Sequence, residues 1–218
     1  ERIAQLCLDR MAKRNRSRAL EIGCKTGRTA FELAAGFDEV VGLDPTARQL
    51  RIGVEMAEKG YTQWEIPKEG DLVDFRQAHL KDLGLDRSRN KVDFQQADLA
   101  NMKALHCGFD LILVNGLLER SYDPAGFLRT VHERLNDGGL LIIACSNDWR
   151  ESVTARENWL GGFKEANGEN LTTLDALHRA LEPHFSRTEA PVTLDRLLRQ
   201  NARVFELAKM EISVWAKR

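Results

Sequence analysis

The chain has 218 residues, of which 43% are hydrophobic, so it is long and apolar enough for one domain with a sizeable core. Its 32 lysine and arginine residues are balanced by 33 acidic residues, which argues against a nucleic-acid partner because such proteins usually carry a basic surplus. No apolar run reaches membrane-spanning length and no leader sequence is recognisable, so we expect a cytoplasmic protein without membrane contacts.

Helical and extended patterns alternate through most of the chain. Residues 1–16 have the spacing of an amphipathic helix. The sequence then predicts strands at 18–23, 39–44, 92–97, 109–115 and 140–145, and helices at 26–35, 46–59 and 123–135. Thr46 is the expected N-cap of the second of these helices. Such alternation predicts a doubly wound α/β fold with a parallel sheet and right-handed crossovers.

Two segments interrupt this alternation. We expect residues 60–90 to be an insertion with a short helix near 72–83. Residues 146–170 are longer than a connection between a strand and a helix needs to be. We therefore expect residues 146–170 to form a lid.

The C-terminal part completes the expected fold. The sequence predicts a helix at 172–181 and two strands, at 184–189 and 205–215. The last strand alternates apolar and polar residues, as an antiparallel strand near a sheet edge does. We therefore expect residues 1–218 to form a single domain around a mostly parallel, seven-stranded sheet with an antiparallel strand near the C-terminus.

Cysteine and histidine spacing gives no sign of a metal site. The histidines show no H-x-x-x-H or H-E-x-x-H pattern, and the cysteines form no C-x-x-C pair, so we expect no bound metal. Buried free thiols in a reducing compartment are the simplest interpretation of the four cysteines, Cys7, Cys24, Cys107 and Cys145.

The turn after the first predicted strand is the first candidate ligand site. It reads Glu21-Ile22-Gly23-Cys24-Lys25-Thr26-Gly27, with a glycine at each end that lets a ligand approach the backbone. It lies at the carboxyl end of a strand and beside a helix N-terminus, where open α/β sheets bind ligands. Lys25 stands where a dinucleotide-binding turn needs its second glycine, which argues against a nicotinamide cofactor. A tight turn without a ligand is the alternative.

Polar residues end the next three strands. Asp44 follows Gly23 by 21 residues, close to the distance at which a carboxylate meets the hydroxyls of a ribose. Asp98 could accept from an adenine amino group, and Asn115 ends the fourth strand. A helix N-cap is the alternative for each aspartate. Because the carboxyl ends of parallel strands meet at one edge, these residues predict a nucleoside-binding crevice.

This series of motifs resembles that of the Rossmann-like class I S-adenosylmethionine-dependent methyltransferases. The matching segments are E-x-G-x-x-x-G, V-V-G-L-D, A-D, F-D-L-I-L-V-N and L-N-D-G-G-L-L-I-I. The resemblance implies that S-adenosylmethionine is the cofactor, with its ribose at Asp44, its adenine at Asp98 and its methyl group near Asn115. The cofactor-binding residues predicted in this way are Glu21, Gly23, Cys24, Gly27, Asp44, Asp98, Leu99 and Asn115.

A narrower resemblance concerns three further segments. LLERSYDP at 117–124, NWLGGF at 158–163 and residues 61–70 resemble the C-terminal methyltransferase domain of the ovothiol-synthesising enzyme. That family couples an iron-dependent sulfoxide synthase to a methyltransferase that modifies a ring nitrogen of 5-thiohistidine. The resemblance implies a thiolated histidine as the methyl acceptor, and a sulfoxide synthase that is fused to the chain or acts with it. The segment 146–154 departs from the pattern expected of the family.

The residues after the fourth strand supply the candidates for catalysis. We predict Asn115, Glu119 and Tyr122 as catalytic residues, because they follow that strand directly and should face the crevice. The predicted acceptor-binding residues are Tyr61, Trp149, Arg156, Trp159 and Lys164. Packing of the long connection is the alternative role for Trp159. A methyltransferase of another small metabolite and a non-catalytic S-adenosylmethionine-binding domain are the alternative functions.

Overall fold

The central sheet contains the strands that the sequence predicted to alternate with helices. The computed structural model describes residues 2–218 and has an eight-stranded sheet in the order β10-β12-β7-β6-β1-β2-β5, with β11 also paired to β12. These strands are β1 (Arg18–Ile22), β2 (Glu39–Asp44), β5 (Val92–Gln96), β6 (Phe109–Asn115), β7 (Leu135–Cys145), β10 (Phe185–Arg187), β11 (Val192–Arg199) and β12 (Phe205–Lys217). The first five are parallel, and β12 is antiparallel to β7, β10 and β11. The predicted doubly wound fold is confirmed, with one strand more than the seven expected.

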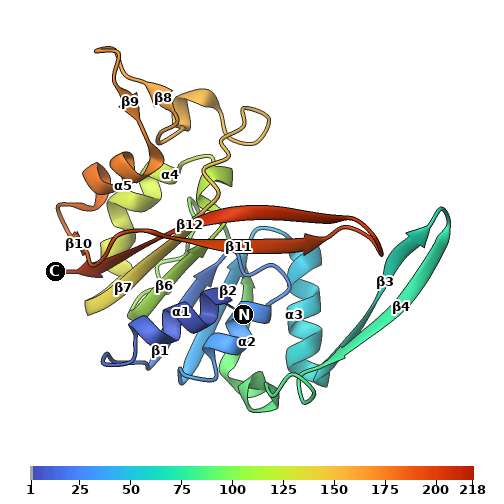
Figure 1. The fold of residues 1–218 in the computed structure, drawn as a ribbon. Helices are drawn as coiled ribbons and strands as arrows, with labels where there is room; N and C mark the ends of the chain where they lie inside the picture. The colour runs from blue at the N-terminus through green and yellow to red at the C-terminus, as the bar shows by residue number, and fades with distance from the viewer. Residues whose placement is uncertain (1) are drawn as a thin grey trace.

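Helices cover both faces of the sheet (Figure 1). One face carries α1 (Arg2–Arg10), α2 (Arg28–Leu33) and α3 (Ala47–Lys59), and the other carries α4 (Pro124–Thr130) and α5 (Thr173–Leu181). The short 3-10 helices are η1 (Asp86–Lys91), η2 (Leu118–Arg120), η3 (Val131–Arg134) and η4 (Arg156–Asn158). Strand β6 explains this arrangement, because Leu111 and Leu113 pack toward α1 and α2 while Ile112 and Val114 pack toward α4 and α5.

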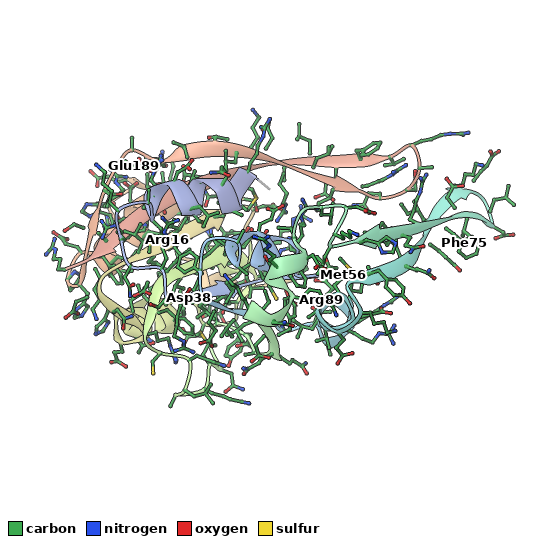
Figure 2. The ribbon with its side chains drawn as sticks, turned by 90° about the horizontal axis from the view of Figure 1, so that it is seen from below. Arg16, Asp38, Met56, Phe75, Arg89 and Glu189 are labelled. Carbon is green, nitrogen blue, oxygen red and sulfur yellow. The ribbon has the colours of Figure 1, made fainter. Side chains whose placement is uncertain are left out.

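The prediction of a short helix near 72–83 is wrong. Residues 61–79 form a long hairpin of β3 (Tyr61–Glu69) and β4 (Leu72–His79), which extends away from the sheet and carries the exposed Phe75 far from it (Figure 2). The physical reason is the turn. Gly70 adopts a φ of 54° in a two-residue Gly-Asp connection, a combination that closes hairpins rather than starting helices.

The strand β11 was not predicted, and it forms a second long hairpin with β12. Because β12 pairs with the end of β7 from Glu211 onward, the residues before Glu211 extend past the carboxyl edge of the sheet. The tips of the two long hairpins meet, where Ala202 N donates to Pro67 O at 3.0 Å and Arg203 lies 3.8 Å from Glu69. Figure 1 shows this meeting beyond the edge of the sheet. A third, small hairpin consists of β8 (Phe163–Lys164) and β9 (Asn170–Leu171).

Several element boundaries differ from the predictions. The helix expected at 123–135 ends at Thr130 and continues as η3, and β7 begins at Leu135 because a register irregularity admits the turn residues into the strand. Thr46 holds the N-cap position of α3 without a side-chain cap bond, and its backbone N donates to Asp44 Oδ1. Cys107 is exposed, contrary to expectation, because it lies in the surface loop before β6, whereas the other three cysteines are buried free thiols.

No helix among residues 2–218 has the length and apolar character that crossing a membrane requires. In the same residues, no group of three or more His, Cys, Asp and Glu side chains could hold a metal ion.

Candidate functional site

A crevice of about 490 Å³ opens where the strand order reverses, between β1 and β6. Its walls are the turn after β1, Asn115 at the end of β6, Ala144 of β7 and residues 194–198 of β11. The reversal point at the carboxyl edge is where doubly wound sheets bind ligands, so the crevice lies where the sequence predicted it. Cys24 and Lys25 line it from the turn.

The glycines of this turn are required by close packing. Gly23 and Gly27 both have a φ of 88°, which a side chain would strain. A Cβ on Gly23 would lie 2.7 Å from the backbone oxygen of Asn115, and a Cβ on Gly27 would lie 2.4 Å from the ring of Phe94. The turn therefore packs directly against the end of β6, which brings its backbone and Asn115 together at the crevice.

Glu21 is the most unusual side chain of the site. It is fully buried, and its Oε1 accepts from Asn115 Nδ2 at 2.8 Å. Its Oε2 has no hydrogen-bond partner among residues 2–218. Burial raises the pKa of Glu21 to about 7, although the bond from Asn115 and the charge of Lys25 oppose the rise. A buried oxygen without a partner costs free energy, so this carboxyl group is suited to a ligand that supplies a donor.

Asp44 links the turn to the start of α3. It is 3% exposed, its Oδ2 accepts from Lys25 N at 3.0 Å and its Oδ1 accepts from Thr46 N at 2.8 Å. Each carboxylate oxygen can accept more than one hydrogen bond, so both remain able to accept from a ligand. The structural role and the predicted ribose-binding role are therefore compatible.

Asp98 and Leu99 follow β5 on the other side of β2. Asp98 Oδ1 accepts from Ala100 N and Asn101 N, both at 2.9 Å, which closes a turn, and the alternative of a helix N-cap is wrong because no helix begins there. Leu99 is buried in the core on the α4 side of the sheet. Contact of these two residues with a cofactor stays a prediction.

Of the three residues predicted to be catalytic, the structure places only Asn115 in the crevice wall. Glu119 is buried, and its carboxylate accepts from Ser146 N at 3.0 Å, Ser146 Oγ at 2.7 Å and Cys145 Sγ at 3.2 Å. The ring of Tyr122 is exposed, while its backbone oxygen accepts from Asn158 Nδ2 at 2.7 Å. Glu119 therefore holds the start of the long connection, a role that its position in the sequence did not reveal.

The predicted acceptor-binding residues are not brought together in the crevice. Trp149 is buried and donates from Nε1 to Thr173 Oγ1 at 2.9 Å. Its ring lies 6.3 Å from that of Trp159, on which the guanidinium of Arg156 packs at 4.3 Å. These contacts agree with the alternative that Trp159 packs the connection. Lys164 lines a separate pocket beside β8 and β9.

Tyr61 lies in a different part of the molecule. It begins β3, and its ring centroid is 5.5 Å from that of His79 on β4. Among residues 2–218, neither ring belongs to the wall of the crevice. The acceptor-binding role of Tyr61, like that of the lid residues, stays a prediction.

The Trp149 contact predicts a change in stability. Trp149→Phe should lower the free energy of unfolding by about 1–2 kcal/mol, because the buried Thr173 hydroxyl loses the indole donor. Urea unfolding measures the change, and a double-mutant cycle with Thr173→Val is the control, since the two losses should not add. Unchanged stability combined with a raised KM for the acceptor would instead assign Trp149 to the acceptor site.

Sequence reasoning missed one part of the crevice wall. Residues 194–198 of β11 line it, and among them Arg196 places its guanidinium over Gly116, the residue after Asn115. Residues 192–199 form β11, whose side chains alternate between half-buried and exposed positions, and β11 pairs with β12. This pairing becomes clear only in the folded protein.

Comparison with known proteins decides the class of the protein. Residues 1–184 match the methyltransferase domain family. This chain belongs to that family. The methyltransferase activity expected from the sequence is thereby confirmed, and the methyl donor of the doubly wound methyltransferases is the predicted cofactor, S-adenosylmethionine. Comparison of the sequence with curated proteins gives no match.

Solved structures resemble this methyltransferase over nearly its whole length. The N-methyltransferase NodS from Bradyrhizobium japonicum, in complex with S-adenosyl-L-homocysteine, has a TM-score of 0.59 and 16% identity, with 99% of this chain and 85% of that chain covered. A SAM-dependent methyltransferase from Methanosarcina mazei has a TM-score of 0.59 and 15% identity, with 96% of each chain covered. A protein described by the conversion of a disulfide bond into a thioacetal group during echinomycin biosynthesis has a TM-score of 0.61 and 16% identity, covering 98% and 80%. At these identities the likeness concerns the fold.

Proposed function

We propose that this methyltransferase transfers a methyl group from S-adenosylmethionine to a ring nitrogen of 5-thiohistidine, as in ovothiol biosynthesis. The observation that supports the donor site is the buried Glu21–Asn115 pair at the crevice, whose second carboxylate oxygen has no partner among residues 2–218. The acceptor is supported by the resemblance of residues 61–70, 117–124 and 158–163 to the methyltransferase domain of the ovothiol-synthesising enzyme.

The residues at the carboxyl edge suit the donor. S-adenosylmethionine would supply a methyl group that is already activated by a positively charged sulfur. Glu21 Oε2 would accept from the ammonium group of the donor, and Asp44 would accept from the ribose hydroxyls. Asp98 and Leu99 would hold the adenine, and the turn from Gly23 to Gly27 would lie against the methionine part.

A neutral imidazole nitrogen can act as the acceptor without a strong base, because it carries a lone pair. The residues of this chain then have to orient the ring and exclude water. Asn115 is suited to orientation, since its amide group is fixed by donating to Glu21 and lines the crevice.

The sulfur of a thiolated histidine is a better nucleophile than its nitrogen, so it must be held away from the methyl group. Lys25 lines the crevice, and its charge would attract a thiolate. The two cations among the predicted acceptor-binding residues lie elsewhere, because Arg156 packs on Trp159 and Lys164 lines the pocket beside β8. The proposal also includes a partner. An iron-dependent sulfoxide synthase, fused to this chain or acting before it, would form the carbon–sulfur bond of the acceptor.

The acceptor is tested by incubating the protein with S-adenosylmethionine and either 5-thiohistidine or plain histidine. We expect N-methylated 5-thiohistidine as the main product, identified by mass and NMR, and much slower transfer to histidine. Equal rates with the two acceptors would contradict recognition of the thiol, and dominant S-methylation would contradict the nitrogen assignment. Transfer to neither would favour another small metabolite as the acceptor.

A further inference from the structure

The hairpin strand β11 turns one set of its side chains toward the crevice. Leu194, Arg196 and Leu198 are half-buried and line the crevice wall, whereas Asp195 and Leu197 between them are exposed although they also border it. Arg196 is therefore the one cation among these inward-facing side chains of β11. The strand carries it across the carboxyl edge from the β7 side of the sheet.

The guanidinium of Arg196 lies at the end of β6. Its Nη1 is 2.8 Å from the point where a Cβ of Gly116 would lie, so the absence of a side chain at Gly116 makes room for it. Gly116 follows Asn115 directly and has a φ of 64°. The Nε of Arg196 is buried and has no hydrogen-bond partner among residues 2–218. A buried donor without a partner is costly, so this group is suited to an acceptor from outside the chain.

The charges around Arg196 leave the crevice positive. Lys25 lines the same crevice, and burial together with the positive charge of Arg196 lowers the pKa of Lys25. Within residues 2–218, neither cation forms an ion pair shorter than 4 Å with a carboxylate.

Two buried carboxyl groups lie close enough to Lys25 that their charges oppose the lowering of its pKa. Glu21 accepts from Asn115 through one oxygen, and both oxygens of Asp44 accept from backbone N–H groups. Asp195, at the neighbouring position of β11, also contributes to the crevice wall, but it is exposed and stands opposite Lys209 of β12. Arg2 and Arg28 also line the crevice, and Arg28 is paired with Glu32. Arg196 and Lys25 therefore lie in a wall with more cations than carboxylates, and neither is in an ion pair among residues 2–218.

We propose that Arg196 forms the subsite that binds the carboxylate of the methyl acceptor, next to Lys25, which would attract the thiolate. This inference rests on the proposed function. Most residues proposed for the donor follow β1, β2 and β5, whereas Arg196 reaches Gly116 from β11 on the opposite side of β6, and Lys25, which follows β1, borders both sites. A guanidinium offers two parallel N–H groups to a carboxylate, which fixes the orientation of the acceptor as well as its affinity.

The test compares Arg196→Gln with Lys209→Gln, which removes a charge from the outer face of the same hairpin. We expect Arg196→Gln to raise the KM for 5-thiohistidine about 10- to 100-fold, the range for loss of a charge-assisted hydrogen bond, while Lys209→Gln leaves it unchanged. Arg196→Lys should recover part of the loss. The decarboxylated acceptor, 5-thiohistamine, should be used equally poorly by the parent protein and by Arg196→Gln. Binding of S-adenosylhomocysteine, measured by calorimetry, should be the same in all three variants.

A second measurement keeps this inference separate from the proposed acceptor. Acetate is titrated into the parent protein and into Arg196→Gln, both saturated with S-adenosylhomocysteine, and the arginine Nε–H signals are followed by NMR. If 5-thiohistidine is not methylated but acetate shifts a signal that is missing in Arg196→Gln, the acceptor is wrong and the subsite stands. If Arg196→Gln matches Lys209→Gln in KM and in acetate binding, the subsite is wrong. Weakened S-adenosylhomocysteine binding in Arg196→Gln would also overturn it, because Arg196 would then serve the donor.

Discussion

Asp44→Ala is expected to weaken S-adenosylmethionine binding by about 2–4 kcal/mol, or roughly 30- to 1000-fold in Kd. The substitution removes the acceptors proposed for the two ribose hydroxyls. It also removes the acceptors of Lys25 N and Thr46 N, which hold the turn after β1 against the start of α3. Calorimetric titration with S-adenosylmethionine and with S-adenosylhomocysteine measures the loss.

Asp44→Asn is the matched control for this experiment. It keeps the size of the side chain and one acceptor oxygen, so we expect a smaller loss than with alanine, and urea unfolding of both variants reports any disturbance of the turn. If Asp44→Ala folds and binds the donor as tightly as the parent protein, the nucleoside lies elsewhere. A loss of stability without a loss of affinity would leave Asp44 with the structural role alone.

We expect the free energy of unfolding of the parent protein to depend on pH through Glu21, and Glu21→Gln should remove most of this dependence. Burial raises the pKa of Glu21 from 4.5 to about 7, so the folded state binds a proton between these values that the unfolded state releases. The stability contributed by this group is therefore complete below pH 4.5 and falls as the pH rises through 7. The difference between the two pKa values corresponds to about 3 kcal/mol at roughly 1.36 kcal/mol per pH unit.

Urea unfolding of the donor-free protein from pH 4.5 to 8.5 tests this prediction. Glu21→Gln should be more stable than the parent protein at pH 8 and should bind S-adenosylmethionine more weakly, because a neutral amide attracts the ammonium group less. Glu58→Gln, at an exposed position, is the control and should change neither quantity. A parent protein whose stability does not decrease between pH 5 and 8 would show that Glu21 ionises normally, and would remove the electrostatic basis of the donor site.

The residues at the carboxyl ends of the parallel strands could be predicted from the sequence. Apolar runs located the ends of β1, β2 and β6, and parallel pairing then required Gly23, Asp44 and Asn115 to meet at one edge. The burial of Glu21 was equally implied, since it lies within a strand whose residues are covered on both faces. The lack of a partner for its second oxygen could not be predicted, because it depends on the side-chain conformation of Asn115.

Contacts set by long-range register could not be predicted. Arg196 reaches Gly116 only because Val192 pairs with Ile212 and the hairpin overhangs the edge of the sheet, and neither fact is visible in residues 192–199 alone. Glu119 is a second residue whose contacts could not be predicted from its position in the sequence. It follows β6 closely in sequence, but its carboxylate turns to Ser146 and away from the crevice.

The meeting of the two hairpin tips has a consequence for exchange of small molecules. Among residues 2–218, the two hairpin tips are joined by one backbone hydrogen bond, from Ala202 to Pro67, and by the exposed pair of Arg203 and Glu69. Such contacts together contribute about 1–2 kcal/mol, so the joined form exceeds the parted form only about 5- to 30-fold. The two tips are therefore weakly joined, and we expect them to part and rejoin without disturbing the pairing of the central sheet.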